Sequence, residues 1–191
     1  MSRQVSHICS TSFLEIRRVA KIRRFLTKKA ATQLVCARVT PRIDYCNSLL
    51  AGISTDQLSR IQRVQNSAAK VILRKKRRDH VTPLLNHLHW LPVQQRIQYK
   101  LGTLAFNFFR GTLPPYLSSK LTKYSPTRSL RSSSQLLLTV PRTKLKSAGQ
   151  RSFRFQVPTL WNSLPLAVRQ SPSLPSFKIK LKTHLYKSAF Y

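Results

Sequence analysis

The sequence predicts a mainly α-helical protein. We expect a helical bundle over residues 1–111, a connection rich in Pro and Ser over 112–134, and a smaller irregular α+β segment over 135–191 with short strands and a last amphipathic helix. Apolar residues recur at helical spacing in several long stretches, and Ser, Thr, Pro and Gly stand at their ends. Leu, Ile, Val and Phe account for 56 of the 191 residues, which is enough apolar material to build a core.

The first expected helix covers residues 12–26. Its apolar face is interrupted by Arg23. A second face is basic, because four cations follow one another at spacings of four, three and four residues: Arg17, Lys21, Arg24 and Lys28. A second helix is expected over 28–38, capped by Thr27.

The segment 42–52 is expected to form a short helix that stops at Gly52. The clearest helix follows it and begins at Ser54, where Ser54 and Gln57 have the spacing of a capping box. Its basic face contains Arg60, Arg63, Lys70 and Arg74. The helix then leads into the run Arg74, Lys75, Lys76, Arg77 and Arg78.

The remaining elements are bounded by proline and glycine. A short helix is expected with Thr82 as its cap and Pro83 as its first helical residue, and Pro92 opens a long helix that Gly111 ends. Later in the chain the pattern predicts a short helix at 114–121, strands at 136–141 and 153–158 that each end in proline, and a last helix at 174–190.

Charge is the most unusual property of the chain. There are 35 Lys and Arg against four Asp and Glu, and the net charge is +31. No acidic residue follows Asp79. A surplus of this size repels itself unless an external polyanion neutralises it, and RNA and DNA are the natural candidates.

The same shortage of acids argues against catalysis. Phosphoryl transfer with two metal ions needs two or three converging carboxylates, and the four acids are far apart in sequence. Three scattered Cys and five His show no zinc-finger spacing, and the four Gly stand too far apart for a phosphate-binding loop. We therefore expect no catalytic residue, no metal, no cofactor and no small-molecule substrate.

Nucleic-acid binding is the physical interpretation that we favour, against the alternative of a merely solvated charged surface. The regularly spaced cations could follow a phosphate backbone. Aromatic residues alternate with cations at 123–128 and 151–155, although core packing is the simpler interpretation of Phe153 and Phe155. The candidate contacts are Arg17, Lys21, Arg24, Lys28, Arg60, Arg63, Lys70, Arg74, Lys75, Lys76, Arg77 and Arg78.

Several strings together resemble one known family. They are RIDYCNSLLAG (42–52), IQRVQNSAAKVI (61–72), LHWLPVQQRIQYK (88–100), PPYLSSKL (114–121), RSLRSSSQLLLTVPRTK (128–144) and LWNSLPLAVRQSPSLPSFKIKLKTHLY (160–186). Their order and spacing resemble the region after the polymerase core in LINE-type non-LTR retrotransposon reverse transcriptases. The resemblance covers nearly the whole chain and rests most specifically on LHWLP followed by LWNSLP.

The resemblance implies a non-catalytic part of that enzyme. The family's catalytic aspartates would lie before residue 1, and none of them matches a position in this sequence. The chain would correspond to the helical thumb and the C-terminal segment, and the thumb of reverse transcriptases grips the template–primer duplex. The unusual lack of acids leaves an alternative open, namely a translated fragment of a decayed element with no selected function and poor stability on its own.

The sequence also bears on localisation. No apolar run approaches the roughly 18 residues of a membrane span, and no signal-peptide pattern stands at the N-terminus. We expect an intracellular protein without a membrane partner. The run at 74–78 is also typical of a nuclear localisation signal, although this pattern is common by chance.

Overall fold

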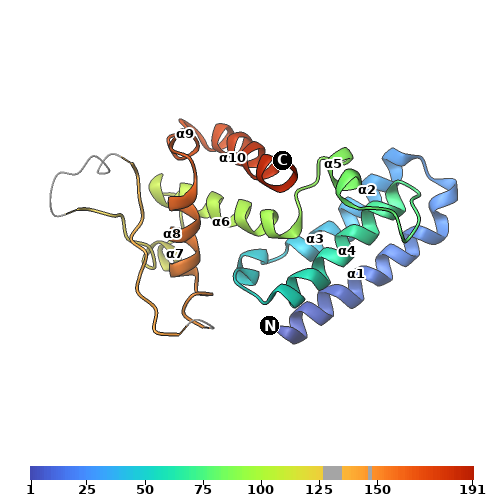
Figure 1. The fold of residues 1–191 in the computed structure, drawn as a ribbon, viewed down its shortest axis with the longest axis horizontal. Helices are drawn as coiled ribbons and strands as arrows, with labels where there is room; N and C mark the ends of the chain where they lie inside the picture. The colour runs from blue at the N-terminus through green and yellow to red at the C-terminus, as the bar shows by residue number, and fades with distance from the viewer. Residues whose placement is uncertain (127–134, 146–147) are drawn as a thin grey trace.

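The computed structural model describes residues 1–126, 135–145 and 148–191, and this part of the protein is mainly helical, as predicted. Figure 1 shows two groups of helices, with α6 lying between them. The elements in chain order are α1 (Ser2–Ile22), η1 (Arg23–Phe25), α2 (Lys28–Arg38), α3 (Thr40–Asp44), η2 (Asn47–Leu50), α4 (Thr55–Ile72), α5 (Thr82–His87), α6 (Val93–Phe109), α7 (Pro115–Ser118), α8 (Phe153–Ser163), α9 (Leu166–Arg169) and α10 (Leu174–Phe190).

Helices α1 and α4 form the main pair of the N-terminal group, with α2 packed against both. Helices α1 and α4 run in the same direction. Near their N-terminal ends, Arg60 donates a hydrogen bond to the Ser6 hydroxyl at 2.9 Å. Near their C-terminal ends, Arg23 donates to the Val71 carbonyl at 2.9 Å. Because contacts join α1 and α4 at both ends, the two long helices lie side by side along much of their length.

Local capping explains where these helices begin and end. The Thr27 hydroxyl accepts a hydrogen bond from the Ala30 N–H, and the Ser54 hydroxyl accepts one from Gln57, so both predicted N-caps are confirmed. At its other end, α4 closes with Arg74 in the left-handed region at φ 52°. The Lys75 N–H then reaches back to the Lys70 carbonyl at 2.9 Å, which is the Schellman pattern.

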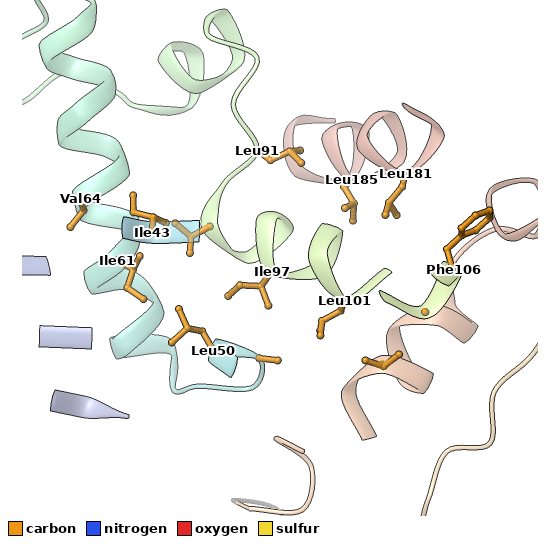
Figure 2. Close-up of a cluster of buried hydrophobic side chains, with 14 of the residues drawn as sticks. Ile43, Leu50, Ile61, Val64, Leu91, Ile97, Leu101, Phe106, Leu181 and Leu185 are labelled. Carbon is orange, nitrogen blue, oxygen red and sulfur yellow. The ribbon is translucent and has the colours of Figure 1, made fainter. Parts of the chain in front are cut away.

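Helix α6 joins the two groups through the core. Figure 2 shows Ile97 and Leu101 of α6 among side chains from α3, η2, α4 and α10. Toward the end of α6, Phe106 stacks on Phe177 of α10 with ring centroids 4.4 Å apart. One continuous hydrophobic cluster therefore contains residues from 5 to 185 and spans both sides of the predicted connection. The division into separate subdomains stays a prediction.

The strand predicted at 153–158 is wrong, because these residues form the first half of α8. The alternation Phe-Arg-Phe-Gln-Val over five positions, 153–157, indicated a strand. Over a longer window the buried positions have helical spacing, since Val157 and Trp161 are both fully buried four residues apart. Pro158 lies inside the helix and is buried, so burial of this face overrides the proline's local preference.

The strand predicted at 136–141 is not formed as a strand either. Within the described residues this segment makes one isolated antiparallel bridge, between Leu138 and Lys123. On its other side a side chain replaces the missing neighbouring strand: the Asn162 amide accepts from the Leu138 N–H at 2.9 Å and donates to the Leu138 carbonyl at 2.8 Å. The backbone is thus satisfied without a sheet.

Other boundaries also differ from the sequence prediction. The first helix begins at Ser2 rather than at residue 12, because Val5 and Ile8 continue its buried face. The expected helix at 42–52 is broken into α3 and η2 by Cys46, which has φ 50°. The short helices at 82–87 and 115–118 and the long helices at 93–109 and 174–190 are confirmed. Thr82, which was predicted as a cap, is the first residue of its helix, and the cap position is Val81. Residues 127–134 of the predicted connection lie outside the described residues.

Candidate nucleic-acid interface

The basic faces of the first helix and of α4 lie next to each other in the fold. On α1 and η1, positions 6, 10, 13, 17, 21 and 24 form one stripe at spacings of three and four. On α4, positions 60, 63, 67, 70 and 74 form another. Arg60 reaches Ser6 at one end, and Arg74 donates to the Arg23 and Arg24 carbonyls, both at 3.2 Å, at the other end.

The two stripes therefore form one surface, which we call the α1/α4 basic surface. Most of its side chains are exposed, whereas Arg60 and Lys70 are partly buried. Arg24 lies over the exposed Phe25 ring, 4.6 Å from its centroid. The members of this surface are Arg17, Lys21, Arg24, Arg60, Arg63, Lys70 and Arg74.

Acidic side chains do not neutralise this surface. Across residues 1–126, 135–145 and 148–191, three ion pairs occur: Glu15 with Arg18, Glu15 with Arg42, and Asp44 with Arg96. None of the twelve predicted contact residues takes part in them. Part of the surplus positive charge thus lies outside these ion pairs on two parallel helices, while other exposed cations, such as Lys180, Lys182 and Lys187, lie on α10.

The run at 74–78 extends the surface beyond the end of α4. Lys70 Nζ donates to the Arg77 carbonyl at 2.5 Å, and the Asp79 carboxylate accepts from the Lys76 N–H at 2.8 Å, so the backbone of the run is held. The side chains of Lys75, Lys76, Arg77 and Arg78 are all exposed. The fixed turn presents four cations to solvent next to Arg74.

Lys28 lies at the edge of this surface rather than on it. Its Nζ is 2.6 Å from Nε2 of His87 in α5. With Arg74 it also lines a recess of about 380 Å³ at the junction of η1, α2 and α4. Of the twelve predicted residues, eleven thus form the surface and its extension, and Lys28 borders them.

Arg23 is the residue whose role the sequence did not reveal. It lies on the buried side of the helix and is 9% exposed. Its guanidinium donates to the carbonyls of Leu26 at 2.7 Å, Val71 at 2.9 Å and Ile72 at 2.6 Å. Burial, and secondarily the nearby Arg74, lower the pKa of Arg23. Arg23 ties the C-terminal end of α4 to that of the first helix, and so sets the relative position of the two basic stripes.

The sequence also did not predict a cavity that shares no residue with the α1/α4 basic surface. It holds about 420 Å³ and is lined by residues from the end of α3, η2, the turn before α6, α6 itself and α10. It brings together Asp44, Trp90, Tyr99 and Lys182, which are far apart in sequence. The adjacent Tyr99 and Lys100 repeat the aromatic-and-basic pattern noted at 123–128 and 151–155. Without the fold, however, nothing distinguishes this pair.

Comparison with known proteins gave no match to this chain among family models, curated proteins or solved structures. Among the described residues, none of the helices is both long and apolar enough to cross a bilayer. In the same part of the chain, no three His, Cys, Asp or Glu side chains gather closely enough to hold a metal ion. The LINE-type resemblance therefore stays a prediction from the sequence strings.

Proposed function

We propose that this chain is a non-catalytic, nucleic-acid-binding segment of a LINE-type reverse transcriptase, which holds RNA or DNA through its phosphates. The observation that supports this most is the α1/α4 basic surface, where unpaired cations on two helices face solvent together. In this proposal the surface acts as the grip of a thumb on a template–primer duplex. It positions the nucleic acid without reading its sequence.

The dimensions of the surface suit a nucleic-acid backbone. From Arg60 to Arg74 is 14 residues, which is about 21 Å at the helical rise. Duplex DNA advances by about 3.4 Å per base pair, so this length corresponds to about six base pairs. Seven cations over that length offer contacts to phosphates on one or both strands.

A salt titration of binding tests the electrostatic mechanism. If the seven cations each neutralise one phosphate, the plot of log K against log salt for duplex DNA has a slope of about −6. For single strands the corresponding slope is about −5. Fluorescence anisotropy with labelled duplex and single-stranded oligonucleotides measures both. An affinity that does not change between low and high salt refutes the proposal.

A matched pair of charge-reversal variants tests the location. Replacing Arg60, Arg63 and Lys70 by Glu should reduce the salt slope by about 2–3 and weaken binding of all sequences alike. The control replaces the exposed Lys120, Arg142 and Lys144 by Glu, with the same change in net charge. These residues follow α7, which Figure 1 shows at the opposite end from α1 and α4. Equal losses in the two variants would show that total charge, rather than this surface, determines binding.

The alternative of a decayed, poorly stable fragment is tested by unfolding the isolated chain. The continuous core from residue 5 to residue 185 favours a cooperative thermal transition. A broad, non-cooperative melt would support the fragment instead. We also propose nuclear localisation through the exposed run at 74–78. Substituting Lys75, Lys76, Arg77 and Arg78 by Ala in a fluorescent fusion should then abolish nuclear accumulation.

A further inference from the structure

Two adjoining cavities form a groove beside α6 and α10, which pack against each other. The first cavity holds about 420 Å³ and the second about 720 Å³, and both are lined by His89 and Lys182. None of the residues that line these cavities belongs to the α1/α4 basic surface. We call the two cavities together the α6/α10 groove.

Aromatic side chains line both cavities of the groove. Trp90 and Tyr99 line the first cavity, and Tyr186 and Tyr191 line the second. Trp90, Tyr99 and Tyr186 are half-buried, so each residue keeps part of its surface open to solvent. Tyr186 is held in place, because its hydroxyl donates to the Asn86 carbonyl at 3.0 Å. Flat aromatic surfaces of this kind stack on nucleobases and tolerate any base.

Lysines stand beside these aromatic residues. Lys100 lies on α6, and Lys182 and Lys187 lie on α10. All three line the groove and are exposed. They take no part in the three ion pairs found among the described residues. The groove therefore combines fixed aromatic surfaces with cations that are available to a partner.

Few negative groups oppose these lysines. Asp44 is the one acidic side chain that lines the groove, and its Oδ2 is paired with Arg96 at 2.5 Å. The other negative group is the carboxylate at the end of the chain, on Tyr191, which lines the second cavity. Positive groups thus outnumber negative ones, and the groove favours an anionic partner.

Aromatic surfaces and lysines together restrict the class of anionic partner. A duplex offers phosphates, but its bases cover one another, so their faces cannot reach aromatic side chains inside a cavity. An acidic peptide offers charge but few flat faces. An unpaired nucleic-acid strand offers both, because its bases can turn away from their neighbours while its phosphates stay near the lysines.

We propose that the α6/α10 groove binds an unpaired strand of RNA or DNA without selecting its bases. The bases stack on the half-buried aromatic residues, and the phosphates contact the three lysines. Lys182 and Lys187 are five residues apart, about 7.5 Å along α10, so they can contact different phosphates of one strand. This proposal rests on the nucleic-acid binding proposed above and adds a second site, for a single strand, to the α1/α4 basic surface.

The first test compares strands with and without bases. A labelled all-thymidine strand of about 12 nucleotides, close to the length of one single-strand binding site, is compared with an abasic strand of the same length and charge. We expect the all-thymidine strand to bind the intact chain about tenfold more tightly, because one or two of its bases stack. Equal affinities of the two strands would overturn the proposal.

Tryptophan fluorescence provides a readout inside the groove. The chain has two tryptophans, and Trp161 is fully buried, so a stacked base should quench Trp90 alone. The all-thymidine strand should quench the intact protein but not Trp90→Phe, and the abasic strand should quench neither. Polyglutamate serves as the competing anion. Quenching of Trp90 by polyglutamate or by the abasic strand, as strong as by the all-thymidine strand, would contradict stacking.

Neutral replacements of the three lysines test the groove without changing a buried side chain. Replacing Lys100, Lys182 and Lys187 by Gln should reduce the salt slope for the all-thymidine strand by about 2, since each loses one phosphate contact. Duplex binding should stay within about twofold. The matched control places Gln at the three control positions used for the α1/α4 basic surface, with the same loss of charge. Equal losses of single-strand binding in the two variants would contradict the groove.

Two outcomes separate this site from the α1/α4 basic surface. If the strands with and without bases bind equally while the Arg60, Arg63 and Lys70 reversal still weakens duplex binding, the groove proposal fails alone. If that reversal leaves duplex binding unchanged while the all-thymidine strand still quenches Trp90, the function proposed for the α1/α4 basic surface fails alone.

Discussion

Replacing Arg23 by methionine tests whether a buried guanidinium holds the C-terminal ends of α1 and α4 together. Methionine keeps much of the apolar volume but removes the hydrogen bonds from the guanidinium to the carbonyls of Leu26, Val71 and Ile72. Arg74 still donates to two of these carbonyls, to Leu26 at 3.5 Å and to Val71 at 3.3 Å. Each hydrogen bond to a charged group contributes about 1.5–3 kcal/mol. The variant also avoids the cost of removing the guanidinium from water, which is several kcal/mol and offsets part of the lost hydrogen-bond energy.

The net destabilisation expected for Arg23→Met is about 2–4 kcal/mol in the free energy of unfolding. For a protein of this size, a loss of about 3 kcal/mol lowers Tm by roughly 6–12 °C. Urea unfolding followed by far-UV circular dichroism measures the free energy, and a thermal melt measures Tm.

The matched control is Arg24→Met, one residue away. Arg24 is exposed and contacts the Phe25 ring, so its removal should change stability by less than about 0.5 kcal/mol. If the two variants unfold at the same urea concentration, the guanidinium of Arg23 contributes nothing net and the reasoning is wrong. Because Arg23 positions α4 against α1, its loss should also weaken nucleic-acid binding in conditions where the variant remains folded.

Two further predictions concern the core. Gly102→Ala should destabilise the protein by about 1 kcal/mol, because the added Cβ would lie 2.9 Å from Leu181 Cδ2. This loss is expected although alanine is the better helix former, so in a Leu181→Ala background the same change should be neutral or stabilising. A thiol reagent at neutral pH should label Cys36 and Cys46 rapidly and Cys9 slowly, since Cys9 is buried. Burial also raises the pKa of Cys9, against the opposing charges of Arg60 and Arg63, so the folded state holds this proton more tightly than the unfolded state. Stability should fall as the pH rises past the ordinary thiol value of 9.0, and Cys9→Ala should remove that fall; labelling of all three thiols at one rate would contradict the packing of α1 on α4.

The sequence predicted the long helices and their caps because these depend on local patterns. Ser54 and Thr27 cap as expected, since a hydroxyl before an apolar-periodic stretch has one nearby N–H to accept from. The strand prediction at 153–158 was wrong because five alternating residues, 153–157, fit a strand, whereas Trp161, four residues after Val157, decides which face is buried. Its indole N–H donates to the Leu136 carbonyl, a contact that only the folded chain provides.

The candidate site was partly predictable for the same reason. Cations at helical spacing predicted two basic faces. The two faces form one surface only because α1 and α4 pack in parallel, and the spacing of residues within each helix does not predict how the helices pack. In the sequence, Arg23 only interrupts an apolar face. The structure shows that its guanidinium donates to three carbonyls. The cavity beside α6 and α10 combines side chains from residues 44–47, 89–100 and 182, so only the three-dimensional arrangement could indicate it.

The central position of α6 has a consequence for dividing the chain experimentally. Because α6 packs on α4 and η2 through Ile97 and on α8 and α10 through Phe106 and Phe109, neither half of the chain carries a complete interior. Two polypeptides produced separately, 1–121 and 135–191, should each be unstructured or aggregation-prone alone and should reassemble when co-expressed. Such complementation would make the protein a split reporter, with the second polypeptide restoring order to the first.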